Sequence, residues 1–498
     1  MNARTKDDAQ RLLEGLEQSG LLKTQGWVAG SWVDGAGRFD VVNPAHGAVL
    51  AAVANMDGHD AVRALAGAQQ AWPAWRGQSA RLRSRVLRNW YDLLVRHTQE
   101  LAHVMTLEQG KPLAEARAEV AYAASFVEWF AEEARRVYGE TMPADTPDRR
   151  FLTVKQPIGV CAAITPWNFP LAMLTRKVAP ALAAGCPVVL KPSEHTPLTA
   201  LMAAELARRA GVPDGVLSVL PADAERSIRI GAALCASPAV RHLSFTGSTA
   251  TGRILMAQCA PTIKALSLEL GGNAPFIVFD DADVDAAVEG AMAAKFRNGG
   301  QACVAANRFF VQSGIYERFV SRLAARVAAL KVGDGLDDGV AVGPMINAQA
   351  VRKIARYVDD ASERGARIVT GGQALGDGRF FAPTVLADVD DGMLCACEEV
   401  FGPVAGVLAF ESESEVVERV NATDYGLAAY VYSGNLARAW RVMEAMECGM
   451  VGINTGMISA AEAPFGGVKQ SGLGREGSRY GMEDYLEIKY ACLGGMDA

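Results

Sequence analysis

Apolar residues between residues 159 and 270 follow two alternating patterns. Short continuous apolar runs predict buried strands, and longer segments whose apolar residues recur at helical spacing predict helices. Strands that alternate with helices predict a parallel sheet with helices on both faces, a Rossmann-like arrangement. The expected strands are residues 159–164, 188–190, 216–220, 242–245 and 265–270, and the expected helices are residues 171–184, 198–210, 224–235 and 249–260.

The rest of the chain repeats this alternation once and adds two smaller patterns. A second strand–helix alternation runs from residue 274 to about residue 456. Short apolar runs between turn residues predict hairpins over residues 27–53. The sequence therefore predicts an α/β fold with two α/β domains and a small β element. Further expected elements are helices within residues 60–138 (79–110 and 113–136), strands at 149–156 and 485–490, and loops at 337–343, 371–378 and 466–474.

Polar residues follow several of the expected strands. Ligands of open parallel sheets bind outside the carboxyl ends of the strands. We therefore expect a ligand site near the four polar residues that fall at such ends: Asn168, Lys191, Thr246 and Glu269.

Two glycine-containing segments resemble phosphate-binding motifs. Residues 247–252 lie between an expected strand and an expected helix, where backbone N–H groups can hold an anion, so a dinucleotide pyrophosphate is the better interpretation. Residues 472–477 match G-x-G-x-x-G but follow a loop near the C-terminus, so we interpret them as a turn.

Cys303 is the candidate nucleophile of the chain. It lies in a polar, glycine-containing segment with Arg297 and Arg308 on either side, and Glu269 stands alone at the end of an apolar run. A carboxylate can act as the base in chemistry that begins with a thiol. Most single cysteines are small buried apolar residues, so the pair alone is a moderate signal.

Five segments together resemble the NAD(P)-dependent aldehyde dehydrogenases. They are Glu-Leu-Gly-Gly at 269–272, Gly-Gln-Ala-Cys at 300–303, Thr-Pro-Trp-Asn-Phe-Pro at 165–170, Phe-Thr-Gly-Ser at 245–248 and Glu-Glu-Val-Phe-Gly-Pro at 398–403. The resemblance implies that family's fold. It assigns residues 1–138 and 159–270 to an NAD-binding domain, 271–470 to a catalytic domain, and 139–158 and 480–495 to oligomerisation strands.

The resemblance also implies roles for individual residues. Cys303 would attack the aldehyde, Asn168 would stabilise the oxyanion, and Glu269 would activate water. Lys177 and Glu476 match positions linked to cofactor placement and proton relay. A carboxylate at Glu194 would favour NAD over NADP as the cofactor. Use of NADP stays possible. The cofactor-binding residues would be Ile164, Thr165, Pro166, Trp167, Lys191, Ser193, Glu194, Gly247, Ser248, Glu399 and Phe401.

Residues 167–177 and 454–477 look closest to the succinate-semialdehyde dehydrogenases. In that subfamily the positions of Arg176, Arg297 and Ser459 bind the distal carboxylate of the substrate, and we expect Phe465 to be a further substrate-binding residue. The alternative is that both arginines pair with local acids. This chain has Ala305 where the subfamily often has a second cysteine, so we expect no redox switch there. Glutarate semialdehyde and other short anionic aldehydes stay open.

Composition narrows the class of protein. The chain has 498 residues, a net charge of −7 and no lysine- or arginine-rich block, so we expect no nucleic-acid partner. The longest apolar run, residues 178–190, is too short to cross a membrane, and no signal peptide is evident. Nine scattered cysteines favour the cytoplasm and no metal site.

Two other classes of protein stay open. The same Cys–Glu pair could catalyse the hydrolysis of a thioester or an ester without a nicotinamide. Alternatively, the chain could be a non-catalytic structural protein with this fold. The open strands at 149–156 and 485–490 would let copies pair as a homodimer or homotetramer, as in the family.

Overall fold

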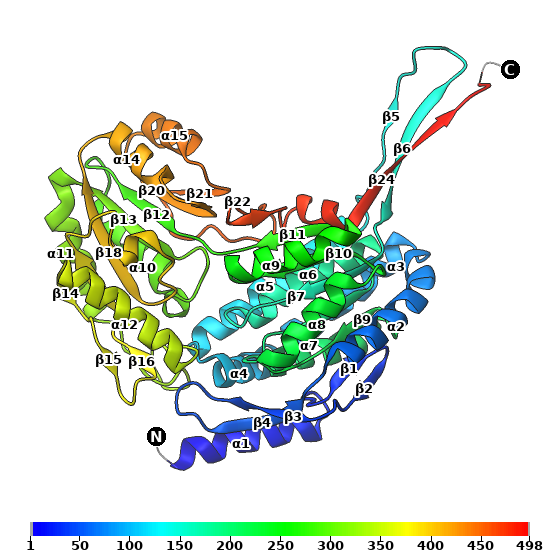
Figure 1. Ribbon diagram of the computed structural model, residues 1–498, viewed down its shortest axis with the longest axis horizontal. Helices are drawn as coiled ribbons and strands as arrows, with labels where there is room; N and C mark the ends of the chain where they lie inside the picture. The colour runs from blue at the N-terminus through cyan, green and yellow to red at the C-terminus, as the bar shows by residue number, and fades with distance from the viewer. Residues whose placement is uncertain (1–2, 497–498) are drawn as a thin grey trace.

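The computed structural model describes residues 3–496, and its first sheet has eight strands (Figure 1). The five central strands are parallel, as predicted, and helices connect them. Both edges are antiparallel, which the sequence did not predict. The strands, in their order across the sheet, are β2 (Ser31–Val33), β1 (Gly26–Val28), β9 (Leu217–Val219), β8 (Val188–Lys191), β7 (Val160–Ile164), β10 (Val240–Thr246), β11 (Ala265–Glu269) and β23 (Gly472–Leu473).

Helices cover both faces of this sheet, and two apolar cores lie beneath them. One face carries α2 (Gly58–Arg76), α8 (Ala224–Ala236) and α9 (Thr249–Cys259). The other face carries α3 (Ala80–Arg96), α4 (Thr98–Gln109), α5 (Leu113–Glu133), α6 (Pro170–Ala184) and α7 (Pro197–Arg209). The helix α1 spans Ala3–Gln18.

The expected single helix over residues 79–110 is wrong, because the structure divides it into α3 and α4. His97, with φ −99° and ψ 26°, is not helical and forms the boundary of both helices. The two helices therefore take different directions and pack separately against α5. The helix expected over residues 113–136 ends earlier, at Glu133.

The second sheet has seven strands and is parallel except at β14. The apolar cores on its two faces are separate from those of the first sheet. Its strands, in spatial order, are β14 (Arg367–Thr370), β17 (Thr384–Ala387), β18 (Val404–Phe410), β13 (Ala306–Gln312), β12 (Ala274–Val278), β20 (Ala428–Tyr432) and β21 (Met450–Ile453). Its helices are α10 (Val284–Phe296), α11 (Tyr316–Ala328), α12 (Ala348–Glu363), α13 (Leu394–Cys397), α14 (Glu413–Asn421) and α15 (Leu436–Ala445).

A three-stranded arm projects from the body at the upper right of Figure 1. It contains β5 (Thr141–Met142), β6 (Arg150–Pro157) and β24 (Leu486–Leu493), with β6 in the middle. Both expected strands of this region are present, and β24 pairs with β6 over its whole length. Ile488 and Tyr490 on β24 are 68% and 56% exposed.

Short elements complete the fold. The hairpins expected over residues 27–53 are β1–β2 and the pair β3 (Arg38–Val42) and β4 (Val49–Ala54). Two of the expected loops contain short strands, β15 (Ala374–Leu375), β22 (Val468–Lys469) and β23. The interpretation of residues 472–477 as a turn is therefore wrong at Gly472–Leu473, which pairs with β11. The others are β16 (Phe380–Phe381), β19 (Tyr425–Gly426), η1 (Ala260–Thr262), η2 (Arg297–Gly300), η3 (Ser313–Ile315) and η4 (Tyr480–Tyr485).

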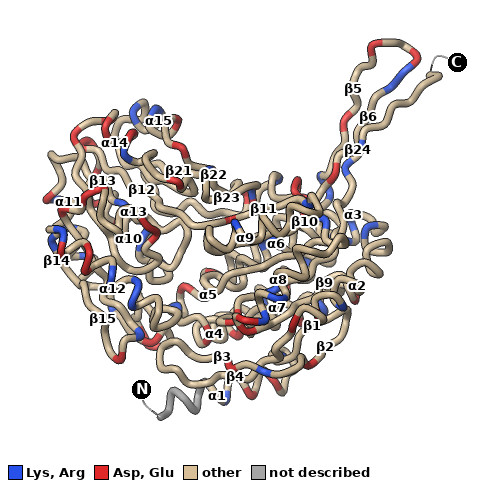
Figure 2. Tube along the Cα trace, viewed as in Figure 1, with Lys and Arg blue, Asp and Glu red and all other residues tan. Residues whose placement is uncertain are grey.

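Charged residues of both signs are interspersed along the chain (Figure 2). Among the described residues, no helix combines the length and the apolar composition that a membrane span requires.

Candidate active site

The polar residues predicted at strand ends do lie at one edge of the first sheet. Ile164 at the end of β7 is in register with Lys191 at the end of β8, and Thr246 at the end of β10 is in register with Glu269 at the end of β11. Parallel strands bring their carboxyl ends to the same edge, which explains the grouping. Asn168 follows β7 by four residues, at the start of α6.

The segment before Cys303 has an unusual backbone. Asn298, Gly299 and Gly300 have φ values of 52°, 61° and 75°, in the left-handed region. Side chains hold Asn298 there: its Nδ2 donates to the Asn168 carbonyl at 2.9 Å, and Gln109 Nε2 donates to its Oδ1 at 3.1 Å. Such strain persists only where surrounding contacts fix it, and it sets the direction of the following thiol.

Gly272, the last residue of the Glu-Leu-Gly-Gly segment, has no room for a side chain. A Cβ atom at Gly272 would lie 2.4 Å from the Cys303 carbonyl oxygen. The backbone after Glu269 therefore packs directly against the nucleophile segment. The Cys303 side chain is half-buried, and its backbone N–H donates no hydrogen bond within residues 3–496.

The Asn168 amide borders the same cleft as Cys303. Its Nδ2 donates to the Gln301 carbonyl at 3.0 Å, and Oδ1 has no partner among the described residues. The second N–H of this amide is therefore available, beside the backbone N–H of Cys303. Two unengaged donors at one place are what a developing oxyanion requires.

Two buried residues that the sequence did not reveal fix the position of Asn168. Lys111 Nζ donates to the Asn168 carbonyl at 2.8 Å and forms a buried ion pair with Glu119. Glu119 Oε1 accepts from the N–H groups of Leu171 and Ala172, at 3.0 and 3.2 Å. It caps α6, which has no capping side chain of its own. Only the fold reveals this cap, because Glu119 is 52 residues from Leu171.

Burial controls the protonation of the two reactive groups. It raises the pKa of the Cys303 thiol to about 12, with Glu399 and Glu269 adding to the shift and Arg176 and Arg297 opposing it. Burial, reinforced by Glu476, also raises the pKa of Glu269 well above its ordinary value. The Cys303 thiol is therefore protonated at neutral pH, and ionisation of Glu269 is disfavoured. A positive charge placed in the cleft would favour the thiolate.

Arg176 takes part in a buried ion cluster, so the alternative of a local acid partner is confirmed for this residue. Its Nε lies 2.5 Å from Glu476 Oε2, and Lys177 Nζ donates to Glu476 Oε1 at 2.5 Å. Burial opposes ionisation of Glu476, but Arg176 and Lys177 outweigh it and lower the pKa of this carboxyl. Arg176 Nη1 has no hydrogen-bond partner among the described residues.

Phe465 and Tyr122 surround the Arg176 guanidinium. Arg176 Cζ lies 4.1 Å from the centre of the Phe465 ring. The Tyr122 hydroxyl lies near the side chains of both Arg176 and Ser459, which lower the pKa that burial raises. The structure therefore groups Arg176, Ser459 and Phe465, as expected, and adds Tyr122, which the sequence did not indicate.

Arg297 differs from Arg176 in having no acid partner among the described residues. Its guanidinium lies over the Phe169 ring at 5.2 Å, and Nη1 lies 4.0 Å from Met457 Sδ. No carboxylate within the described part of the chain lies within 4 Å of it. Arg297 and Ser459 border a hollow of about 10 Å³. The guanidinium is thus free to pair with an anion.

A cleft of about 830 Å³ leads from Cys303 to the N-terminus of α9. This volume suits a large ligand. Trp167 and Phe401 meet edge to face, with ring centres 5.5 Å apart. Of the expected cofactor residues, Pro166, Trp167, Gly247, Ser248, Glu399 and Phe401 border the cleft, and so do Asn347, Gln349, Arg352, Lys353 and Arg356 of the α12 region, which the sequence did not indicate.

Glu399 lies at the end of the cleft near Cys303. The Gly272 N–H donates to Glu399 Oε1 at 3.0 Å. Burial raises the pKa of Glu399 to about 7, against the opposing effect of this N–H group and of Lys353 and Lys295. The Glu399 segment is itself held by Asn307, whose Nδ2 donates to the Glu398 carbonyl at 2.9 Å.

The other expected cofactor residues lie outside the border of this cleft. Ile164 and Thr165 are at the end of β7, and Lys191, Ser193 and Glu194 follow β8. Glu194 lies 3.7 Å from Lys191 Nζ and accepts from Ser193 Oγ at 3.2 Å. Burial opposes its ionisation, but Lys191, a backbone N–H, His195 and Ser193 together outweigh burial, so the pKa of Glu194 is lowered.

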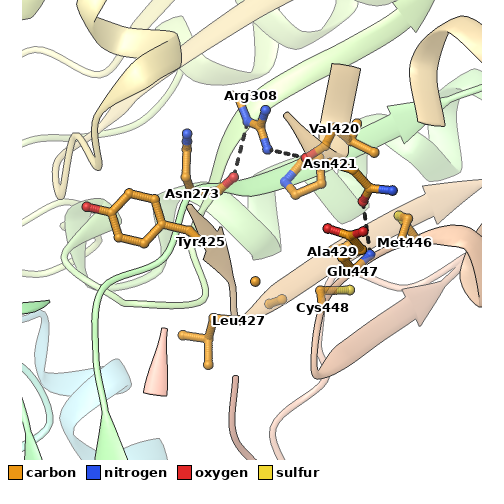
Figure 3. A pocket seen from close by; sticks show the side chains of 13 residues that line it. Asn273, Arg308, Val420, Asn421, Tyr425, Leu427, Ala429, Met446, Glu447 and Cys448 are labelled. Carbon is orange, nitrogen blue, oxygen red and sulfur yellow. Dashed lines mark hydrogen bonds between the residues drawn. The ribbon is translucent and has the colours of Figure 1, made fainter. Parts of the chain in front are cut away.

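A separate hollow of about 10 Å³ behind β12 contains none of the expected site residues (Figure 3). Arg308 borders it and donates to the carbonyl groups of Asn273, Arg419 and Val420, at 3.2, 3.3 and 3.0 Å. Its guanidinium is therefore used to tie α14 to the second sheet and is not available to a ligand.

Comparison with known proteins places the chain in a family. A model of the aldehyde dehydrogenase family matches residues 32–491. A glutarate-semialdehyde dehydrogenase of Pseudomonas aeruginosa is 56% identical and covers 97% of this chain and 100% of its own length. A succinate-semialdehyde dehydrogenase of Escherichia coli, whose name specifies NADP(+), is 55% identical and covers 96% of this chain and 99% of its own.

The fold agrees with a solved relative. The crystal structure of succinate-semialdehyde dehydrogenase from Burkholderia pseudomallei matches with a TM-score of 0.94 and 56% identity, over 95% of this chain and 98% of that one. The nucleophile segment, the cleft and these comparisons lead to one conclusion: the chain belongs to the aldehyde dehydrogenase family.

Proposed function

We propose that this enzyme oxidises a short aldehyde that carries a distal acid group, with succinate semialdehyde as the main substrate and NAD(P) as the oxidant. One observation carries the proposal: the Cys303 thiol and the Asn168 amide border a cleft large enough for a dinucleotide, and Arg297, which has no acid partner among the described residues, is near enough to lower the pKa of the Cys303 thiol. The names of the relatives are in keeping with an acid-bearing aldehyde.

Each catalytic residue has its own role in the proposed reaction. The Cys303 thiolate attacks the aldehyde carbon, and the Asn168 amide and the Cys303 N–H stabilise the oxyanion. The bound nicotinamide would accept the hydride. Glu269 then takes a proton from water, whose hydroxyl adds to the resulting thioester and releases the acid from Cys303.

The dinucleotide would lie along the cleft. Backbone N–H groups at the start of α9, beside Gly247 and Ser248, would hold its pyrophosphate. Glu399 and Phe401 would hold the nicotinamide end near Cys303, and Lys191 and Glu194 the adenosine ribose. Residues 1–138 and 159–270 would then form the cofactor domain and 271–470 the catalytic domain, although residues 1–2 lie outside the described part of the chain.

We expect Arg297→Ala to lower kcat/KM for succinate semialdehyde by roughly tenfold to a hundredfold, mainly through KM. A charged hydrogen-bonded pair at a partly buried site contributes about 1.5–3 kcal/mol. The value of kcat/KM for the neutral aldehyde butanal should change little, because butanal has no carboxylate for the guanidinium to bind. Initial rates of both substrates with the wild type and the variant test this.

Arg326→Ala is the matched control, because Arg326 forms only an exposed ion pair with Glu289. Equal losses for succinate semialdehyde and butanal in Arg297→Ala would remove the carboxylate role of Arg297. The same assay with glutarate semialdehyde compares the two acids. Absence of reduced nicotinamide with every aldehyde, together with turnover of thioesters or esters, would favour the hydrolase alternative.

NAD is the proposed preferred cofactor, although the relative from Escherichia coli is named for NADP(+). Ionised Glu194 would bind ribose hydroxyls and repel a 2′-phosphate. Glu194→Gln should therefore raise kcat/KM with NADP and lower it with NAD. Initial rates with both dinucleotides measure the ratio, and equal efficiency in the wild-type enzyme would contradict the preference.

We propose a homodimer or homotetramer that pairs through the arm. Its support is the exposed apolar side chains of the outer strand β24, an edge that a second copy could cover. The cytoplasm stays the predicted location.

A further inference from the structure

The two donors of the oxyanion site come from different parts of the chain. Asn168 precedes α6, which covers the first sheet, and Cys303 lies between η2 and β13, a strand of the second sheet. A displacement of about 1 Å between groups that must act together can cost a hundredfold in rate. Contacts between the two parts must therefore fix the Asn168 amide relative to the Cys303 N–H.

Four buried amide side chains lie at this boundary. Gln109 at the end of α4, Asn168, Asn298 and Gln301 are 0%, 5%, 2% and 2% exposed. We call these four residues the amide bridge. A buried amide is stable only where its donors and acceptors are engaged, so the partners of these groups determine how the backbone around them is held.

Two hydrogen bonds of opposite direction join Asn168 to the segment that leads to Cys303. Asn168 Nδ2 donates to the Gln301 carbonyl at 3.0 Å, and Asn298 Nδ2 donates to the Asn168 carbonyl at 2.9 Å. Within that segment, Gln301 Nε2 donates to the Asn298 carbonyl at 3.2 Å. Asn168 therefore cannot move relative to residues 298–303 without breaking both bonds.

Gln109 determines which way the Asn298 amide points. Gln109 Oε1 accepts from the Lys111 N–H at 2.9 Å, so its Nε2 faces Asn298 and donates to Asn298 Oδ1 at 3.1 Å. Because the oxygen of the Asn298 amide is turned to Gln109, its nitrogen is turned to the Asn168 carbonyl. Without Gln109, nothing in this set of contacts would choose that orientation over the reverse.

The connection between α4 and α5, which carries Gln109, is enclosed by the loop between α11 and α12. A Cβ atom at Gly110, whose φ is 95°, would lie 2.6 Å from Pro344 Cγ, and one at Gly343 would lie 2.1 Å from the Gly110 carbonyl oxygen. A Cβ atom at Gly335 would lie 2.5 Å from the Lys111 carbonyl oxygen. Backbone packs on backbone here, so Gln109 has a fixed base.

We propose that the amide bridge sets the geometry of the oxyanion site, an inference that rests on the proposed function. Gln109 and Asn298 are its positioning residues, since neither borders the cleft and both act through Asn168. Amides hold this geometry without a proton to titrate, so they fix the two donors without adding a charge beside the thiol.

Steady-state kinetics of the full-length enzyme test the role of Gln109. Gln109→Met keeps a similar volume but removes both hydrogen bonds of the side chain. The value of kcat should fall by roughly tenfold to a hundredfold, because the amide donor is misplaced. KM for succinate semialdehyde, the Kd of NADH from fluorescence titration and the shape of the pH profile of kcat should stay as in the wild type.

A second pair of enzymes separates positioning from a general loss of stability. In an Asn168→Ala background no amide is left to misplace, so adding Gln109→Met should lower kcat by no more than about threefold. An equal loss with and without the Asn168 amide would overturn the proposal. So would a wild-type kcat in Gln109→Met.

Glu108→Gln is the matched control. Glu108 is 1% exposed and adjacent to Gln109, but its carboxyl accepts from the N–H groups of Leu198 and Thr199 at the start of α7, both at 2.8 Å. The change therefore disturbs an equally buried polar contact that faces away from the amide bridge. Glu108→Gln should keep the wild-type kcat, and a loss as large as that of Gln109→Met would contradict the specific role.

Asn298→Gly decides alone should Gln109→Met misfold and fail to bind NADH. Glycine adopts the φ of 52° at this position without strain, and the change removes the Asn298 amide. Asn298→Gly should show the same loss of kcat, again only where Asn168 is present; an unchanged kcat would overturn the proposal. Absence of NADH formation by the wild-type enzyme with every aldehyde would instead contradict the proposed function, so the two failures are distinguishable.

Discussion

Replacing Cys303 by alanine should abolish aldehyde oxidation, with a loss of at least about 10⁴-fold in kcat, as for other covalent nucleophiles. Without the thiol no thioester forms, and hydride transfer has no tetrahedral adduct to start from. The fold should tolerate the change, because a half-buried cysteine is replaced by a smaller apolar residue. Formation of reduced nicotinamide measures the loss.

Cys397→Ala is the matched control for this experiment. Cys397 is an exposed free thiol in α13, and its Sγ donates to the Asp391 carbonyl at 3.1 Å. It should keep full activity, and both variants should still bind the dinucleotide. Substantial turnover by Cys303→Ala would refute the nucleophile assignment.

Glu269→Gln should form one equivalent of reduced nicotinamide and then nearly stop. The amide keeps the shape of the side chain but accepts no proton from water, so the thioester accumulates. In the wild type, the hydrolysis step should slow as pH falls through the raised pKa of Glu269, because only its ionised form is a base. Rapid mixing over a range of pH measures both effects.

Loss of stability cannot explain that expected result. A buried carboxyl whose pKa is raised by folding destabilises the folded protein once the pH rises above the pKa that this carboxyl has in the unfolded chain. Glutamine removes this penalty, so the melting temperature of Glu269→Gln at neutral pH should not fall. A normal steady state in this variant would indicate a different base.

The sequence predicts the parallel strands and their ligand-binding ends because apolar periodicity and polar strand ends are local signals. The sequence does not predict the break at His97 or the strand β23. A single non-helical residue leaves apolar spacing intact, and two residues become a strand only because β11 offers an unpaired edge. Both features depend on packing between distant segments.

The candidate site divides in the same way. Cys303 and Glu269 are visible because their motifs are contiguous. Lys111 and Glu119 are not, because they act on Asn168 and α6 from other helices. The pairing of Arg176 with Glu476 joins residues 300 positions apart, so it too required the fold.

The central claim is that oxidation proceeds through an acyl group on Cys303. Its most direct test is mass spectrometry of Glu269→Gln mixed with NAD and succinate semialdehyde. The account predicts one succinyl group per chain on the peptide that contains Cys303, formed only when NAD is present. Equal formation of reduced nicotinamide with no modified Cys303 peptide would contradict it.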